Sequence, residues 1–173
     1  GALRINAICM DDAMVASGAA ADALAELADM ATARGMGFTI EFFPPAGITS
    51  LDRALAIVRH IGPGKARLLI DSMHFFRTGG TVEELSALDP DLIGYVQLSD
   101  LPPGVADDAY FAMAMFARGI PGEGTLPLAD FVRALPDHVT VSLEVPRLAD
   151  LRAGMTPCDH AARCVAAARA LWD

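Results

Sequence analysis

The stretch RLLIDSMH, residues 67–74, decides the fold because it joins an apolar run to a carboxylate, Asp71, and a histidine, His74. Three other stretches share this design: FTIEFFPP at residues 38–45, GYVQLSD at 94–100 and VSLEVP at 141–146. In each of them, one side chain with an oxygen donor stands near the end of an apolar run, and a turn follows. Short apolar runs bounded by turn signals are typical of buried β-strands.

Segments typical of strands and of helices alternate along the chain. Strands are predicted at Arg4–Met10, Phe38–Phe43, Ala66–Asp71, Leu92–Leu98 and Val139–Val145. Helices are predicted at Ala20–Arg34, Ser50–Ile61, Thr81–Leu88, Tyr110–Ala117, Leu128–Leu135 and Cys158–Trp172. This alternation favours parallel strands joined by right-handed crossovers, and hence one α/β domain over residues 1–173. No G-x-G-x-x-G turn follows a strand, and the turn Gly62–Lys65 lacks the spacing of a phosphate loop, so a dinucleotide-binding sheet has no support.

The composition excludes several classes of protein. Hydrophobic residues make up 53% of the 173 residues, which is too many for a disordered segment. No apolar run reaches the ~18–20 residues of a membrane-spanning helix, and the net charge of −9 opposes binding to nucleic acid. The only lysine, Lys65, lies ahead of a strand, which excludes a Schiff-base enzyme. The three cysteines form no C-x-x-C pair, and this favours a reducing cytoplasm over a disulfide-bonded, secreted protein.

The side chains with oxygen donors at the strand ends are Glu41, Asp71, Gln97 and Glu144. Because parallel strands place their carboxyl ends at one edge of a sheet, we expect these four to converge. Side chains alternate along a strand, so Glu41 shares a face with Thr39, while their apolar neighbours pack on helices. Buried carboxylates that face one another are tolerated around a cation, and an all-oxygen set favours Mn²⁺ or Mg²⁺, with Co²⁺ or Zn²⁺ also possible. The alternative is that each acid caps a loop or pairs with an arginine.

Three further side chains lie close to this predicted metal site. His74, on the loop that leaves the strand at Asp71, could hydrogen-bond a substrate hydroxyl or act as an acid/base near neutral pH. Asp100, three residues after Gln97, could orient a ligand or a substrate. Arg118 opens the segment RGIPGEG, and its guanidinium could clamp a carbonyl or hydroxyl of a polar substrate. The alternative for His74 is an ordinary histidine on a loop, and the alternative for Arg118 is a surface arginine in a turn, neither with a role in binding.

The pattern resembles the xylose isomerase-like (β/α)8 barrel superfamily, in its sugar phosphate isomerase and epimerase branch. The residues that carry the resemblance are Glu41, the D-x-x-H of Asp71 and His74, Gln97 with Asp100, the R-x-x-P-G-x-G of residues 118–124, and Glu144. Many relatives have a histidine where Gln97 stands. The resemblance implies that one divalent metal is held by Glu41, Asp71, Gln97 and Glu144. It also implies that Glu41 and Glu144 are the acid/base residues, and that His74 and Arg118 hold the substrate's oxygens.

The activity implied by this resemblance is that of a metal-dependent isomerase or epimerase acting through an enediolate. Its substrate would be a small sugar, keto acid or cyclitol, with neither nucleic acid nor a membrane as partner. Two alternatives stay open: a dehydratase of an inosose-like or dehydroshikimate-like substrate, and an inactive barrel fragment that acts as a binding module.

The predicted strands are too few for a closed barrel. A complete barrel has eight strands in ~250 residues, whereas five strands are predicted here, so the first three βα units are expected to be missing. We therefore expect a fragment, a chain with further segments, or a core completed by another copy in a homo-oligomer.

Overall fold

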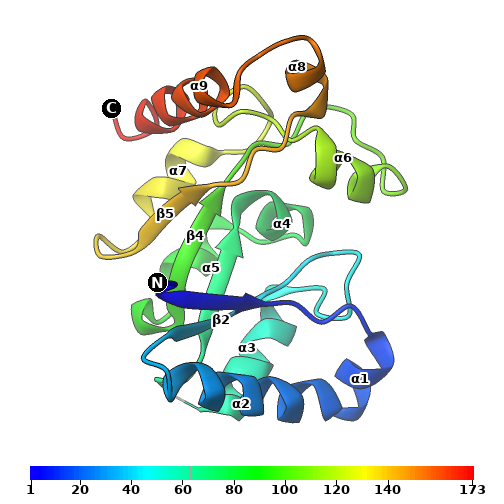
Figure 1. Cartoon of the computed structure of the whole chain (residues 1–173), viewed down its shortest axis with the longest axis vertical. Coiled ribbons are helices and arrows are strands. Elements are labelled where there is room, and N and C mark those ends of the chain that lie inside the picture. Colours follow the sequence, from blue (N-terminus) through cyan, green and yellow to red (C-terminus); the bar gives the residue numbers. More distant parts are fainter. Residues whose placement is uncertain (63) are drawn as a thin grey trace.

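Five parallel strands form one sheet in the computed structural model, which describes residues 1–62 and 64–173 (Figure 1). The strands are β1 (Arg4–Ala7), β2 (Gly37–Glu41), β3 (Arg67–Asp71), β4 (Ile93–Leu98) and β5 (Thr140–Leu143). Their order in the sheet is their order in the chain. The predicted α/β class with parallel strands is therefore confirmed. The turn predicted at Gly62–Lys65 contains Pro63, which lies outside the described residues.

Helices lie between successive strands and after β5. They are α1 (Asp12–Ser17), α2 (Ala19–Thr32), α3 (Leu51–Ile61), α4 (Ser72–Arg77), α5 (Val82–Ala87), the 3-10 helix η1 (Pro90–Leu92), α6 (Tyr110–Phe116), α7 (Leu128–Arg133), α8 (Leu148–Arg152) and α9 (Pro157–Arg169). Helices α2, α3, α5, α6, α7 and α9 lie where the sequence predicts helices. The short helices α1, α4 and α8 are not among the predictions. In Figure 1, α2 and α3 lie at the β1 end of the molecule, and α9 lies at the β5 end.

The face of the sheet that packs on helices is apolar. Its fully buried strand residues are Ile40, Leu68, Ile70, Val96 and Leu98. They belong to one core with residues of the helices, among them Ala28, Val58, Leu85 and Phe131. Burial of one such large side chain contributes about 1.5–3 kcal/mol, so this layer supplies most of the stability of the fold.

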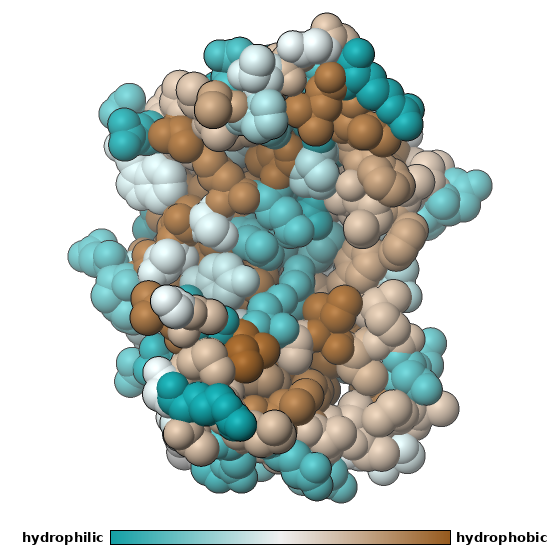
Figure 2. Space-filling view, in the orientation of Figure 1, coloured by the Kyte–Doolittle hydropathy of each residue, from teal (hydrophilic) through white to brown (hydrophobic). Residues whose placement is uncertain are grey.

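The opposite face of the sheet carries polar side chains in register. Asn6 on β1 lies beside Thr39 on β2, and Asp71 on β3 lies beside Gln97 on β4. Gln97 in turn lies beside Ser142 on β5. In the space-filling view, hydrophilic surface runs through the middle of the face toward the viewer, between hydrophobic areas (Figure 2). The alternation of side chains therefore separates an apolar core from a polar face, as the sequence predicts.

Capping residues fix where two of the helices begin. The Asp71 carboxylate accepts the backbone N–H groups of Met73 and His74, at 2.9 and 3.1 Å, and so starts α4 directly at the end of β3. Thr81 and Glu84 form a capping box at the start of α5, as their spacing predicts. The chain can therefore turn from β3 into a helix without an intervening loop.

The sheet has two edge strands, β1 and β5, and it does not close on itself within the described residues. Apolar side chains on and after β1 are partly exposed, including Ile5, Ile8 and Met10. Among the described residues, no helix is both long and apolar enough to cross a membrane.

Candidate metal-binding and active site

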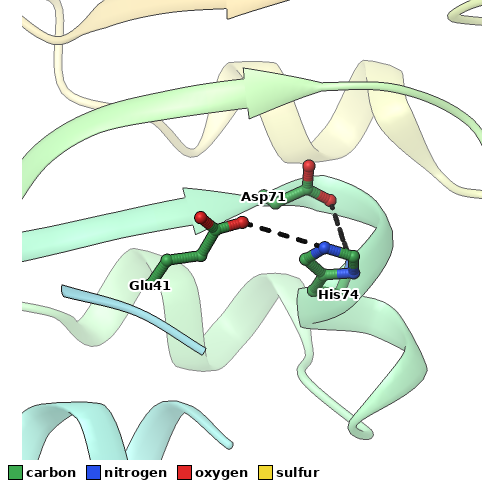
Figure 3. Close-up of side chains that lie close together, drawn as sticks. All are labelled: Glu41, Asp71 and His74. Atoms are coloured by element: carbon green, nitrogen blue, oxygen red, sulfur yellow. Dashed lines mark hydrogen bonds and ion pairs between the residues drawn. The ribbon is translucent and has the colours of Figure 1, made fainter. Parts of the chain in front are cut away.

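The carboxyl ends of four strands gather the predicted ligand residues at one edge of the sheet. Glu41 ends β2, Asp71 ends β3, Gln97 lies one residue before the end of β4, and Glu144 follows β5 directly. Glu41 Oε1 lies 3.8 Å from His74 Nε2, and Asp71 Oδ1 lies 4.0 Å from His74 Nδ1 (Figure 3). One possible ligand atom from each of these three residues lies within 4.8 Å of the other two. This spacing is that of groups that can share one cation.

Arg118 joins two of the carboxylates. Its Nη1 donates to Asp71 Oδ2 at 2.6 Å and lies 3.2 Å from Glu144 Oε2. Its Nε donates to the backbone oxygen of Ala114 at 2.8 Å, which fixes the buried guanidinium. The sequence left open that each strand-end acid pairs with an arginine. This alternative holds in part, because the guanidinium of Arg118 contacts both Asp71 and Glu144. Three carboxylates with a single guanidinium leave a surplus of negative charge, which favours a further cation.

Burial changes the protonation of the site. Burial and then the negative charge of Asp71 raise the pKa of Glu41 from its ordinary value to about 7, although the hydrogen bond from Asn6 lowers it. Burial also raises the pKa of Glu144, against the lowering effect of Arg118. Burial lowers the pKa of His74 to about 4, so its imidazole is neutral at pH 7. Near neutral pH, Glu41 therefore exchanges between carboxylate and carboxylic acid, as an acid/base group must.

Gln97 contributes an oxygen that no described residue satisfies. Its Oε1 is buried and accepts no hydrogen bond from the described part of the chain. A buried polar atom without a partner costs about 1–3 kcal/mol, so in a native site such an atom is expected to bond to a water, an ion or another ligand. The register places Gln97 beside Asp71, within the acidic cluster. An amide oxygen in that place fits the donor set of a hard divalent cation.

His74 lies on helix α4, so the prediction that it lies on a loop is wrong. The Asp71 cap starts the helix directly after β3, and His74 is in its first turn. The imidazole Nδ1 lies 2.7 Å from the Tyr110 hydroxyl, and Nε2 lies 3.4 Å from Nη2 of Arg118. The ring of Phe43 lies 4.7 Å away, tilted by 48°. These contacts hold the imidazole rigidly inside the cluster.

Asp100 has different surroundings from the other predicted site residues. It is fully buried, and its carboxylate oxygens accept backbone N–H groups at distances between 2.8 and 3.0 Å, from Leu101, Gly122, Gly124 and Leu126. Its backbone also pairs with Gly119. These bonds order the segment that follows Arg118. The Asp100 carboxylate is thus bound to the backbone of its own loop and of this segment, and its predicted role of orienting a ligand or substrate stays a prediction.

Two residues of the site are absent from the sequence prediction. Asn6 on β1 donates from Nδ2 to Glu41 Oε2 at 2.6 Å. Tyr110, at the start of α6, is buried and contacts His74. Asn6 lies one residue before the end of β1, as Gln97 does on β4, but the predicted strand runs to Met10 and so places Asn6 away from its end. Tyr110 belongs to a helix, which a search of strand ends cannot find. The alternation of side chains along β1 was the signal available for Asn6.

The comparisons with known proteins concern the family and the fold of this chain. The profile of the family described as xylose isomerase-like TIM barrel matches residues 12–163. An inosose isomerase of Bacillus velezensis is 30% identical over 146 residues, which cover 79% of this chain and 50% of that protein. The chain thus spans about half the length of the curated relatives that it matches.

Solved structures show the same fold. A xylose isomerase domain-containing protein of Salmonella typhimurium superposes with a TM-score of 0.78 at 17% identity, over all of this chain and 64% of that one. The IolI protein, solved with a zinc atom, superposes with a TM-score of 0.66 at 23% identity, over 87% of this chain and 52% of that one. The chain belongs to the xylose isomerase-like TIM barrel family, and its five parallel strands form part of such a barrel.

Proposed function

We propose that this chain forms the cation-binding and proton-transferring part of an isomerase or epimerase. Its substrate would be a small polyhydroxylated ketone, such as a sugar, keto acid or cyclitol. The observation that carries the proposal is the cluster at the strand ends. Glu41, Asp71 and His74 offer ligand atoms within 4.8 Å of one another, and Arg118 contacts both Asp71 and Glu144. The buried Oε1 of Gln97 beside them has no hydrogen-bond partner among the described residues. The 30% identity with an inosose isomerase over 79% of this chain supports it.

The donor set fits a divalent cation. The residues that would hold it are Glu41, Asp71, Gln97 and Glu144. Because all the donors are oxygen atoms, Mn²⁺ or Mg²⁺ is favoured, with Co²⁺ or Zn²⁺ as alternatives. The unpaired Oε1 of Gln97 is the atom that supports this fit most directly. When bound, the ion would stabilise negative charge on two adjacent oxygens of the substrate.

Glu41 and Glu144 carry the proposed proton transfers. Glu41 ends β2 and Glu144 follows β5, and the strands β3 and β4 lie between these two. The two carboxyl groups therefore approach the centre of the cluster from different sides. One of them removes the proton from the carbon that lies between the ketone and a hydroxyl group, and an enediolate forms. The other, in its protonated form, donates a proton to the enediolate, and burial favours the protonated form of both groups because it raises their pKa values. Return to the opposite face of that carbon gives an epimer, and return to the neighbouring carbon gives an isomer.

Arg118 and His74 would orient the substrate. Arg118 Nη2 and His74 Nε2 lie 3.4 Å apart, so both groups can contact the same substrate oxygen. The guanidinium supplies a fixed positive charge, whereas the imidazole is neutral because burial lowers its pKa to about 4. This pair therefore binds a polar oxygen without placing a second positive charge beside the proposed cation.

The proposal is tested by ion binding and by proton exchange. Chelator-treated protein is titrated with Mn²⁺ by calorimetry and is then incubated with an inosose in D₂O while proton NMR spectra are recorded. We expect one ion per chain, and replacement of the hydrogen next to the ketone by deuterium.

Other outcomes would contradict the proposal. Loss of water from the inosose, with a new carbon–carbon double bond, would assign the dehydratase reaction instead. Ion binding without exchange of hydrogen would contradict the catalytic role. A chain that binds no divalent ion would favour the binding module.

A further inference from the structure

Asn6 reaches the acidic cluster from the edge strand β1. It lies beside Thr39 in the register between β1 and β2, and Thr39 shares a face with Glu41 two residues later. The Asn6 side chain spans the two strands, and its Nδ2 donates to Glu41 Oε2 at 2.6 Å. Asn6 is therefore the residue of β1 that touches the group of proposed ligands.

Thr39 fixes the orientation of the Asn6 amide. Its Oγ1 lies 3.2 Å from Asn6 Oδ1 and 3.4 Å from the backbone oxygen of Ile5. Because the NH₂ group of Asn6 donates to Glu41, the amide oxygen faces Thr39 and can accept its hydroxyl hydrogen. The buried Thr39 side chain has room because residue 94 is glycine: a Cβ at residue 94 would clash with Thr39 Cγ2, at a distance of 2.5 Å.

This chain of hydrogen bonds determines which oxygen of Glu41 is free. Oε2 is occupied by Asn6, whereas Oε1 is turned toward His74, 3.8 Å away, where the ligand atoms gather. A free glutamate side chain has three rotatable bonds, and ordering it at the moment of ion binding costs conformational entropy. A side chain that is already held in the binding orientation avoids this cost.

We propose that Asn6 is a positioning residue, held by Thr39, that presents Oε1 of Glu41 to a divalent cation. This inference rests on the proposed function, since it concerns the same cation. Groups that orient a ligand residue typically change metal affinity by about 10–100-fold when they are removed. Because Asn6 is exposed at the edge of the sheet, we expect the lower end of that range.

The test compares Mn²⁺ affinity in matched variants of the whole chain by calorimetry. Asn6→Ala is expected to weaken binding about tenfold with one site per chain retained. Thr39→Val, which removes the hydroxyl and keeps the shape, is expected to weaken binding by a smaller factor, and Thr39→Ser is expected to restore it. The control is Ser142→Ala, because among the described residues the Ser142 hydroxyl bonds only to the backbone oxygen of Val96. Circular dichroism melting of each variant reports its folding.

The outcomes separate the two proposals. Wild-type affinity in both Asn6→Ala and Thr39→Val would overturn the positioning role and leave the proposed function standing. An equal loss in Ser142→Ala would also overturn it, because the effect would then be a general one on the sheet. Failure of the wild-type chain to bind Mn²⁺ would overturn the proposed function itself. If Asn6→Ala fails to fold, the comparison of Thr39→Val with Thr39→Ser decides.

Discussion

At the scale of single residues, Arg118 makes the acidic cluster compatible with a folded chain. The Asp71 side chain is fully buried, and its Oδ2 lies 2.6 Å from the guanidinium. A buried carboxylate without a counter-charge is strongly unfavourable, and Asp71 has Glu41 and Glu144 as neighbours of like charge. The metal-free protein therefore depends on this one cation.

Replacement of Arg118 should lower stability. In the presence of a chelator, Arg118→Met is expected to reduce the free energy of unfolding by about 3–5 kcal/mol, because Asp71 then stays buried and unpaired. Addition of Mn²⁺ should recover part of the loss. Urea unfolding followed by circular dichroism measures both effects. The control is Arg133→Met, whose ion pair with Asp130 is exposed. A variant as stable as the wild type would show that Arg118 is not the counter-charge.

Replacement of Glu144 should affect the reaction and leave the fold intact. Its side chain is 42% exposed, so Glu144→Gln removes the proton-accepting group at little structural cost. We expect the rate of deuterium exchange into substrate to fall about 10²–10⁴-fold, the usual contribution of an acid/base group. The melting temperature should stay close to that of the wild type. Wild-type exchange rates in this variant would remove Glu144 from the mechanism.

The sequence predicts part of the site because of where these residues stand. Glu41, Asp71 and Gln97 each end or nearly end an apolar run, and parallel strands bring such ends together without further information. Asn6 and Tyr110 belong to the site because their side chains point from β1 and α6 toward Glu41 and His74. That direction depends on register and helix packing, which a single sequence does not specify.

At the scale of elements, the segment after Arg118 is organised by Asp100. Residues 119–126 contain three glycines, and the Asp100 carboxylate gathers backbone N–H groups from this segment. The fit is close: a Cβ at Gly124 would lie 2.4 Å from Asp100 Oδ1. In this glycine-rich segment, the Asp100 carboxylate accepts the backbone N–H groups that would bond to backbone oxygens in a helix or a sheet.

Loss of Asp100 should release this segment. In Asp100→Ala we expect the amide hydrogens of Gly122 and Gly124 to exchange with solvent at least tenfold faster, because their acceptor is gone. Unfolding free energy should fall by about 2–3 kcal/mol, the cost of buried donors left unpaired. Hydrogen exchange followed by mass spectrometry or NMR measures the first effect. Asp108→Ala, at an exposed position before α6, is the control. Unchanged exchange at both glycines would contradict this role of Asp100.

The sequence predicts the regular elements better than the short ones. Each strand is found because several apolar residues define it, although β1 ends at Ala7, before the predicted Met10. The helix α4 is missed because its six residues, SMHFFR, have no helical periodicity long enough to detect. Its stability comes from the Asp71 cap, which is a local contact, and from burial of Met73 and Phe75, which is a tertiary effect.

At the scale of the whole molecule, both edges of the sheet are open. Beside β1 lies an apolar groove of about 480 Å³, lined by residues that include Ile5, Leu27 and Met30. A second groove of about 630 Å³ lies past the end of β5, between α6 and α9, and its lining includes Arg118 and Glu144 of the site as well as Val165. Unpaired strand edges with apolar surroundings are templates for association with further strands. The expectation of a homo-oligomer stays a prediction.

The open edges should make this chain self-associate. Sedimentation or light scattering over a range of concentrations should show a mass that rises above 18.2 kDa. Ile5→Lys, which places a charge on the β1 edge, is expected to shift the distribution toward monomer. Leu151→Lys, at an exposed position on α8, should leave the distribution unchanged. A monomer at every concentration would contradict the prediction.

The order of the strands also has a consequence for folding kinetics. The four oxygen-donor side chains stand at or just after the ends of β2, β3, β4 and β5, which lie in the sheet in chain order. Each donor therefore reaches the site when its strand pairs with the preceding strand. Pairings between such distant segments form slowly compared with local contacts. During synthesis, Glu144 emerges after the other three donors have left the ribosome, and the set becomes complete when β5 docks on β4. Acquisition of the ion would thus mark the final step of maturation of this sheet.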